Sequence, residues 1–541
     1  MDGCLGRISR LRNGVRGGMI ALLWLLWTGL NAFPARAVAD DSARPEGIVG
    51  FDQVVEFARR TAARPYQASP QLPAGLKDMT YDLYKMISFD IKKPIWLNHK
   101  RPVWLETFHR GYVHQDQVSL NLIADGKENH LPFTKDLFEY RQDAKKLEIN
   151  GDLGFAGMRL VGTFPEYPER QEFVAFLGSS YFRARDAENV YGSSTRGLAI
   201  DIGMNKTEEF PIFREFWIVK PQPDDPDVTI YGLLDSPSVA GAYHFKLVPG
   251  IKKTTLDIRA TLFFRKAVDK VGFAPLTSMW MWGDGLAGPK GDPRPEVHDA
   301  DGLLIAEPGN KWSWRAVSRQ EYPSVVRMPY TDIRGFGVIQ RDRNVDHYRD
   351  QEAMYHRRPS VWIEPQGNWG AGAIELLELD APHEGIDNVA VWWVPERVDQ
   401  SGAPVNLQYR VSFFSGDPPG HTLGKATAFR VVRQSPESMN VEVDFAGTAL
   451  AELPAEAALT VEVASVRAAV TSATCKKNDG GSWTANLAVR PTREGPIELK
   501  ATVKSQGQAL TETWSYLCPL NVPPVSIPPW RLKEMEGKVK E

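Results

Sequence analysis

The sequence Thr255-Leu-Asp-Ile-Arg-Ala-Thr-Leu-Phe-Phe-Arg265 decides the fold class of this chain. Apolar and polar side chains alternate along it, so that one face carries Leu256, Ile258, Ala260, Leu262 and Phe264. A period of two places successive side chains on opposite faces of a β-strand. Residues 229–234, 389–394 and 407–413 repeat the pattern. The segment is therefore predicted to be one strand of an extended sheet.

Strand-like runs dominate the chain on both sides of this segment. From about residue 90 onward, short alternating runs are separated by Gly, Pro and Asn. Strands without intervening helices favour one large antiparallel sandwich or barrel over an α/β fold, so an all-β first domain is predicted. No internal repeat of fixed period is present, which argues against a propeller. One helix is predicted at residues 51–60, where Phe51, Val54, Val55 and Ala58 share a face.

Composition divides the chain into two β domains. The stretch Ser415-Gly-Asp-Pro-Pro-Gly-His-Thr-Leu-Gly424 is rich in Gly and Pro, so residues 415–426 are predicted to form a linker. The first domain then covers residues 46–414. Residues 427–521 hold about seven short strands, a size and spacing typical of an immunoglobulin-like sandwich. Residues 522–541, rich in proline and then in charge, are predicted to be a flexible tail.

The N-terminus has the features of a secretory signal peptide. Four arginines precede an apolar run at residues 19–30, and small residues follow at Ala35, Ala37 and Ala39. A run of about a dozen apolar residues is shorter than the roughly 20 that span a bilayer. We therefore expect residues 1–39 to be a signal peptide that is cleaved on export.

Charge and cysteine content limit the kinds of partner. A formal charge of −3 with interspersed signs offers no basic surface for nucleic acid and no polybasic membrane patch. Beyond the signal peptide the cysteines are Cys475 and Cys518, in a compartment that permits disulfides, and they either pair or stay as two buried thiols. Without a dense His/Cys cluster, no metal site is predicted.

Ionisable residues concentrate in Arg294-Pro-Glu-Val-His-Asp-Ala-Asp-Gly302, which holds Glu296, His298, Asp299 and Asp301. Tryptophans flank this stretch at positions 280, 282, 312 and 314, and a Gly/Pro-rich passage precedes it. Sugar rings stack on indole and carboxyl groups move protons, so the combination is typical of a sugar-cleaving groove. A solvated acidic loop is the alternative.

A second acidic loop, His383-Glu-Gly-Ile-Asp-Asn388, precedes Trp392 and Trp393. Loops on a rigid β scaffold often carry sites, although an Asp-Asn pair before a strand also fits ordinary turn chemistry. A third cluster, at residues 335–343 and 355–359, supplies arginines that either orient carboxylates or form surface ion pairs. No Gly-x-Ser-x-Gly, P-loop or His-Glu-x-x-His motif is present, and no cofactor is predicted.

Several ordered passages match a known family. They include Phe176-Leu-Gly-Ser-Ser-Tyr-Phe-Arg183, Arg196-Gly-Leu-Ala-Ile-Asp201, Leu233-Leu-Asp-Ser-Pro237, the acidic stretch quoted above, Arg334-Gly-Phe-Gly337 and Glu512-Thr-Trp-Ser-Tyr516. On these passages the chain resembles the periplasmic glucan biosynthesis proteins G and D over essentially its mature length. The resemblance implies a periplasmic protein with a large galactose-mutarotase-like antiparallel β-sandwich that bears a groove, followed by an immunoglobulin-like sandwich. Whether the chain is G-like or D-like stays open.

The resemblance also implies an activity and a site. The family makes osmoregulated periplasmic glucans with a β-1,2-linked backbone, and its members resemble anomer-inverting endo-β-1,2-glucanases. By position, Asp387 matches the general acid and Asp299 the proposed base, with Glu384 and Tyr355 nearby. Glu384 is expected to supply the like charge that keeps Asp387 protonated. The expected supporting or substrate-binding residues are Asp301, His298, Arg294, Trp312, Trp314 and Trp369.

Three functions follow from this resemblance. The first is an inverting endo-β-1,2-glucanase that trims the nascent glucan. The second is a non-catalytic or transferase-like assembly factor that binds the growing chain and guides it from the inner-membrane synthase for branching. The third, sugar epimerisation, rests on fold analogy alone. The expected partners are β-1,2-linked glucan and, functionally, that synthase; a homodimer is left open.

Overall fold

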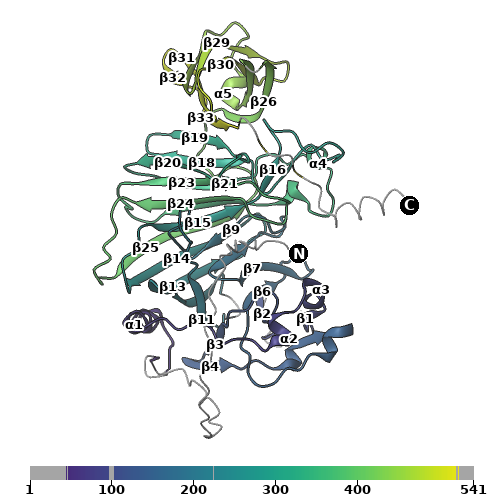
Figure 1. The fold of residues 1–541 in the computed structure, drawn as a ribbon, viewed down its shortest axis with the longest axis vertical. Coiled ribbons are helices and arrows are strands. Elements are labelled where there is room, and N and C mark those ends of the chain that lie inside the picture. The colour runs from purple at the N-terminus through teal and green to yellow at the C-terminus, as the bar shows by residue number, and fades with distance from the viewer. Residues whose placement is uncertain are drawn as a thin grey trace, which may run out of the picture.

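The computed structural model describes residues 44–45, 47–96, 103–222, 225–435, 437–519, 522 and 525. Most of the strands belong to two large sheets, shown in Figure 1. The 10-stranded sheet consists of β2 (Val103–Phe108), β6 (Gly157–Gly162), β7 (Gln171–Leu177), β8 (Tyr181–Ala184), β9 (Ser194–Arg196), β15 (Val271–Ser278), β24 (Val389–Pro395), β23 (Gly372–Glu378) and β20 (Ser324–Tyr330) in spatial order, with β10 (Leu198–Ile200) on β15. The prediction of an all-β sandwich is confirmed.

The second sheet has 15 strands. Its spatial order is β28 (Leu459–Val466), β31 (Ile497–Ser505), β33 (Thr513–Cys518), β19 (Lys311–Ala316), β18 (Gly302–Glu307), β21 (Gly335–Ile339), β22 (Ser360–Pro365), β25 (Val405–Phe414), β14 (Lys253–Phe264), β13 (Val239–Val248), β12 (Val228–Asp235), β11 (Ile212–Val219), β3 (Ser119–Ala124) and β4 (Lys127–Leu131), with β32 (Gln508–Ala509) on β31. Side chains from both sheets form the main core between them.

Strand β14 shows how the alternating sequence produces this core. Leu256, Ile258 and Leu262 are buried between the sheets, whereas Arg259 is exposed on the other face. The strand pairs with β13 on one side and β25 on the other, both antiparallel. Burial of apolar side chains at about 25 cal/mol per Å² stabilises this arrangement.

One long helix covers the outer face of the 15-stranded sheet. Helix α1 (Phe51–Ala62), close to the predicted 51–60, packs Val54, Phe57 and Ala58 against Trp217 and Ala242. Figure 1 places it beside β13, away from the C-terminal strands. Among the described residues, no helix is long and apolar enough to cross a lipid bilayer.

The C-terminal strands form a smaller sandwich. One layer is the sheet β26 (Lys425–Ser435), β27 (Ser438–Ala446), β30 (Trp483–Pro491) and β29 (Ala468–Lys477), and the other consists of β28, β31 and β33. Strand β33 also pairs in parallel with β19, where Trp514 lies opposite Trp314. Because of this pairing the 15-stranded sheet runs from the large sandwich into the small one, and their side chains share a second core.

The structure does not test the predictions for the two chain ends, but it answers whether the two cysteines pair. The predicted signal peptide, residues 1–39, and nearly all of the predicted tail lie outside the described residues. Cys475 and Cys518 are free thiols, so the disulfide that the sequence left open is not formed. The physical reason is their placement, since Cys475 lies on β29 and Cys518 on β33, in different sheets.

Candidate active site

Two acidic loops meet because both are fixed to one short segment, Ser278–Trp280. The Asp299 amide donates to the Met279 carbonyl over 2.8 Å. Asn388, next to Asp387, accepts from the Trp280 amide and donates to the Trp280 carbonyl, each over 2.8 Å, through its side chain. Asn388 also donates its own amide to the Ser278 carbonyl over 3.1 Å. This backbone arrangement brings the two predicted catalytic loops to the same site.

Asp299 is a buried carboxylate held by an arginine. The residue is 3% exposed, and the Arg358 guanidinium donates to Asp299 Oδ1 over 2.5 Å. Burial raises the pKa of Asp299 above its ordinary value, the positive charge of Arg358 opposes that rise, and the negative charge of Asp387 adds to it. The two aspartates therefore influence each other electrostatically.

Asp387 is the more accessible of the pair, with 19% of its side chain exposed. Its Oδ2 lies 4.0 Å from Arg183 Nη2. Arg183 belongs to β8 and lines a cavity of about 490 Å³. Arg183 thus contacts Asp387 and also lines this cavity.

That cavity lies between the start of the 10-stranded sheet and the two-stranded sheet of β1 (Ile87–Phe89) and β5 (Phe138–Tyr140). Three of its buried polar atoms, Thr107 Oγ1, His109 Nε2 and His114 Nδ1, have no hydrogen-bond partner among the described residues. Burial lowers the pKa of both histidines to about 4, so each ring is neutral near pH 7. Buried polar atoms are normally satisfied, so unpartnered atoms on three residues that line one cavity are unusual.

Arg294 organises the loops behind the aspartates. Its guanidinium forms ion pairs with Asp292 at 2.8 Å, Asp350 at 3.0 Å and Glu384 at 2.8 Å. It also lies over the Trp282 ring, 5.3 Å from the centroid. Arg294 carries one positive charge and pairs with three carboxylates, so the charge of Glu384 is only partly compensated. That Glu384 supplies a like charge to Asp387 stays a prediction.

Tyr355 is close to both the Asp299–Arg358 ion pair and the Arg294–Glu384 ion pair. It is 1% exposed and begins the short 3-10 helix η5 (Tyr355–Arg357), and the Arg358 guanidinium lies 4.6 Å from the centroid of its ring. Burial raises the pKa of Tyr355 well above its usual value, and the nearby Glu384 and Asp299 carboxylates add to this. The Tyr355 hydroxyl is therefore protonated near both carboxylates.

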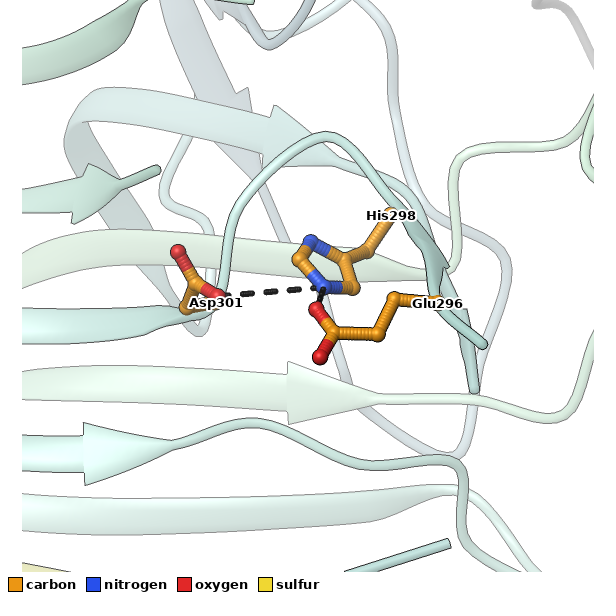
Figure 2. A group of neighbouring side chains, drawn as sticks. All are labelled: Glu296, His298 and Asp301. Atoms are coloured by element: carbon orange, nitrogen blue, oxygen red, sulfur yellow. Dashed lines mark hydrogen bonds and ion pairs between the residues drawn. The ribbon is translucent and has the colours of Figure 1, made fainter. Parts of the chain in front are cut away.

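The remaining ionisable residues of the acidic stretch form a separate cluster, drawn in Figure 2. His298 Nε2 lies 2.9 Å from Glu296 Oε2 and 3.7 Å from Asp301 Oδ1. Burial disfavours the charged ring, but the two carboxylates outweigh it and raise the pKa of His298 to about 9. Asp301 also accepts hydrogen bonds from the amides of Arg341 and Asp342. Glu296, His298 and Asp301 therefore interact with one another rather than with Asp387.

The three predicted stacking tryptophans lie in packed surroundings. Trp312 stacks on His421 at 4.4 Å between ring centroids, and Trp314 lies under the Arg341 guanidinium at 3.7 Å, both in the core shared with the C-terminal sandwich. Trp369 packs at the edge of the main core against Trp393 and donates to the Gln408 carbonyl. None of the three lines the cavity next to Asp387.

Sequence reasoning missed several residues of this site. In the sequence, Arg183 and Arg358 stand only within matching or arginine-rich passages, and Asn388 fits ordinary turn chemistry. Thr107, His109 and His114 belong to none of the motifs described above. No local signal identifies them, because their importance comes from contacts with distant segments.

Comparison with known proteins gives consistent matches. The family model described as periplasmic glucan biosynthesis protein, MdoG, matches residues 49–518. Glucans biosynthesis protein G of Ralstonia nicotianae is 38% identical over 495 residues, covering 88% of this chain and 97% of that protein. Glucans biosynthesis protein D 1 of the same organism is 37% identical over 514 residues, covering 90% and 95% respectively. Glucans biosynthesis protein G of Sodalis glossinidius is 34% identical over 496 residues, covering 88% and 95%.

Proposed function

Because the chain belongs to the MdoG family of periplasmic glucan biosynthesis proteins, as its sequence predicted, we propose that it is a periplasmic inverting endo-β-1,2-glucanase. Its substrate in this proposal is the backbone of the periplasmic glucan. The observation that carries the proposal is the fixing of Asp299 and Asp387 to the same Ser278–Trp280 segment, next to a cavity with unsatisfied polar groups.

In the proposed mechanism Asp387 protonates the leaving glycosidic oxygen. It is the more exposed carboxyl, and Arg183 places it beside the cavity. Inverting hydrolases use a second carboxylate to activate water on the opposite face of the sugar ring. Asp299 takes that role. Burial raises its pKa, and the Arg358 guanidinium opposes that rise and favours the ionised form that a base requires.

Asp299 activates water through a relay in this proposal. Only 4% of its side chain is exposed, so direct contact with a water on the sugar is restricted. Tyr355 is close to both Asp299 and Glu384 but is itself only 1% exposed, so in this proposal a second water reaches its hydroxyl, which takes a proton from that water and gives its own proton to Asp299. Arg294 holds Glu384 and orients this relay.

The cavity supplies the glucan-binding surface. Thr107, His109 and His114 offer hydroxyl and neutral ring groups to sugar hydroxyls, and Tyr84 and Tyr181 add aromatic faces. The same surface serves the alternative function, a factor that holds the nascent chain without cutting it. The two functions differ only in whether the aspartates break bonds.

The test is release of new reducing ends from purified linear β-1,2-glucan. The wild type should release them, Asp387→Asn and Asp299→Asn should each lose most of the rate, and the exposed control Asp346→Asn should keep it. Glucan binding without release by the wild type, measured by calorimetry, would favour the assembly factor. Equal release by Asp387→Asn would remove its role as the acid.

A further inference from the structure

We propose that Glu296, His298 and Asp301 form a binding site for one divalent cation, separate from the two catalytic aspartates. His298 Nε2 and one oxygen from each carboxylate lie within 4.8 Å of one another. Figure 2 shows both carboxylates directed at the same ring nitrogen. One imidazole and carboxylate oxygens are the ligand types that bind Mn²⁺ and Zn²⁺ in proteins.

The tautomer of His298 is fixed by Gln340. The Gln340 Nε2 group donates to the carbonyls of His298 and Tyr355 and to the Tyr348 hydroxyl, which fixes the orientation of the amide. Gln340 Oε1 therefore faces His298 Nδ1 at 3.1 Å and accepts a hydrogen bond from the Nδ1–H group. A histidine that donates from one nitrogen in this way presents the other nitrogen as a metal ligand.

The charge of the cluster also favours a cation. Asp284 lines the same small cavity as His298 and Asp301, so three carboxylates, with Glu296, surround one imidazole. A proton on His298 compensates only one of these charges, and uncompensated buried charge is costly. Arg341 lines this cavity as well, but its guanidinium is engaged by Glu512 and Asp417. A divalent cation in place of the ring proton would reduce the negative excess by one further charge.

The cavity beside this cluster has a volume of about 20 Å³. That is room for about one water-sized particle, which suits a single ion and excludes a larger ligand. Asp284 Oδ2 accepts from the Phe429 amide over 2.8 Å, so the cavity lies where the loop between β16 (Trp280–Trp282) and β17 (Val297–His298) meets strand β26. A bound cation would therefore stabilise the contact between the two sandwiches.

The experiment measures Mn²⁺ uptake by the full mature chain after dialysis against EDTA. Calorimetry and the electron paramagnetic resonance signal of free Mn²⁺ should give one equivalent bound to the wild type. Asp301→Asn and His298→Gln should lose it, and Gln340→Leu should weaken it about 10- to 100-fold because the ring loses its orienting partner. Asp342→Asn and His347→Gln, which change the neighbouring group Glu296, Asp342 and His347, should keep it.

Two results would overturn this site. The first is a folded wild type that takes up no Mn²⁺, a measurement that needs no variant. The second is binding that survives Asp301→Asn but is lost in Asp342→Asn, which would move the ion to the neighbouring group. If circular dichroism shows that Asp301→Asn does not fold, His298→Gln replaces it. Mn²⁺ binding that survives in His298→Gln but is lost in His347→Gln would then overturn the site. Neither comparison depends on hydrolysis of glucan.

Discussion

Arg358 donates to Asp299 Oδ1 over 2.5 Å while lying over the ring of Tyr355. One guanidinium thus contacts both the proposed base and the proposed relay residue. Because the carboxylate is almost fully buried, this bond is the main interaction that favours its ionised form. The first two predictions follow from this contact.

Arg358→Met should move the acidic limb of the pH profile of kcat/KM upward by about one to three units, because an opposite charge at this distance lowers a carboxyl pKa by that amount. Burial and the charge of Asp387 then raise the pKa of Asp299 against only the weaker opposing charges of Arg183 and His298. The control is Arg397→Met, an exposed arginine. A profile that stays in place in a folded Arg358→Met protein would show that Asp299 is not the titrating base.

Tyr355→Phe should lower kcat by about 100-fold and leave KM nearly unchanged, since only the hydroxyl of the proposed relay is lost. Steady-state kinetics on linear β-1,2-glucan measures both constants. Tyr243→Phe is the matched control, because it removes an equally buried hydroxyl that donates to the Gly197 carbonyl in the main core. Similar losses of kcat in the two variants would speak against the relay.

Thr107→Val should raise KM about fivefold without changing kcat, because a buried hydroxyl that serves the ligand is replaced by a group of the same shape. Thr195→Val is matched to it. Thr195 Oγ1 is also buried without a hydrogen-bond partner among the described residues, but it does not line the cavity. If both variants keep the KM of the wild type, the cavity does not bind the glucan at this point.

Glu512→Gln should destabilise the fold by about 3–5 kcal/mol at pH 7, because it leaves the buried cation of Arg341 poorly compensated. Arg341 donates to both Glu512 oxygens and His421 contacts one of them at 2.6 Å, and these partners outweigh burial and lower the pKa of Glu512 to about 2. A lowered carboxyl pKa gives stability that is complete above the ordinary value of 4.5 and is lost as the pH falls through about 2.

Denaturant unfolding between pH 7 and pH 2 checks this prediction. The wild type should lose more stability on acidification than Glu512→Gln, so the two curves should converge at low pH. Glu462→Gln, which removes an exposed partner of Lys504, should change stability by less than about 1 kcal/mol. Parallel curves for the wild type and Glu512→Gln would contradict the pKa shift of Glu512.

The sequence predicts those parts of the structure that depend on local patterns. The alternation in β14 and the apolar stripe of α1 are properties of neighbouring residues, and both elements form as expected. The parallel pairing of β33 with β19 joins segments on either side of the predicted linker and has no local signal. Likewise, Asn388 and Trp280 are 108 positions apart, and only the folded sheets bring them together.

The same distinction between local patterns and contacts of distant segments applies to the candidate site. The family resemblance points to Asp299, Asp387, Glu384 and Tyr355, and the structure adds the charged side chains that lie beside them. Arg294 forms an ion pair with Glu384, which the sequence could not indicate because the pair joins two separate loops. The indole side chains of Trp312 and Trp314 flank the acidic stretch in sequence, but their positions on β19 place them in the core under the C-terminal sandwich.

The measurement that tests the central claim most directly is proton NMR of the anomeric signals during digestion of linear β-1,2-glucan. An inverting enzyme with Asp387 as acid should give new reducing ends that are first α and then equilibrate to the mixture, and Asp387→Asn should give none on the same timescale. New reducing ends that are first β, or no cleavage by the folded wild type at any pH tested, would contradict the proposed function.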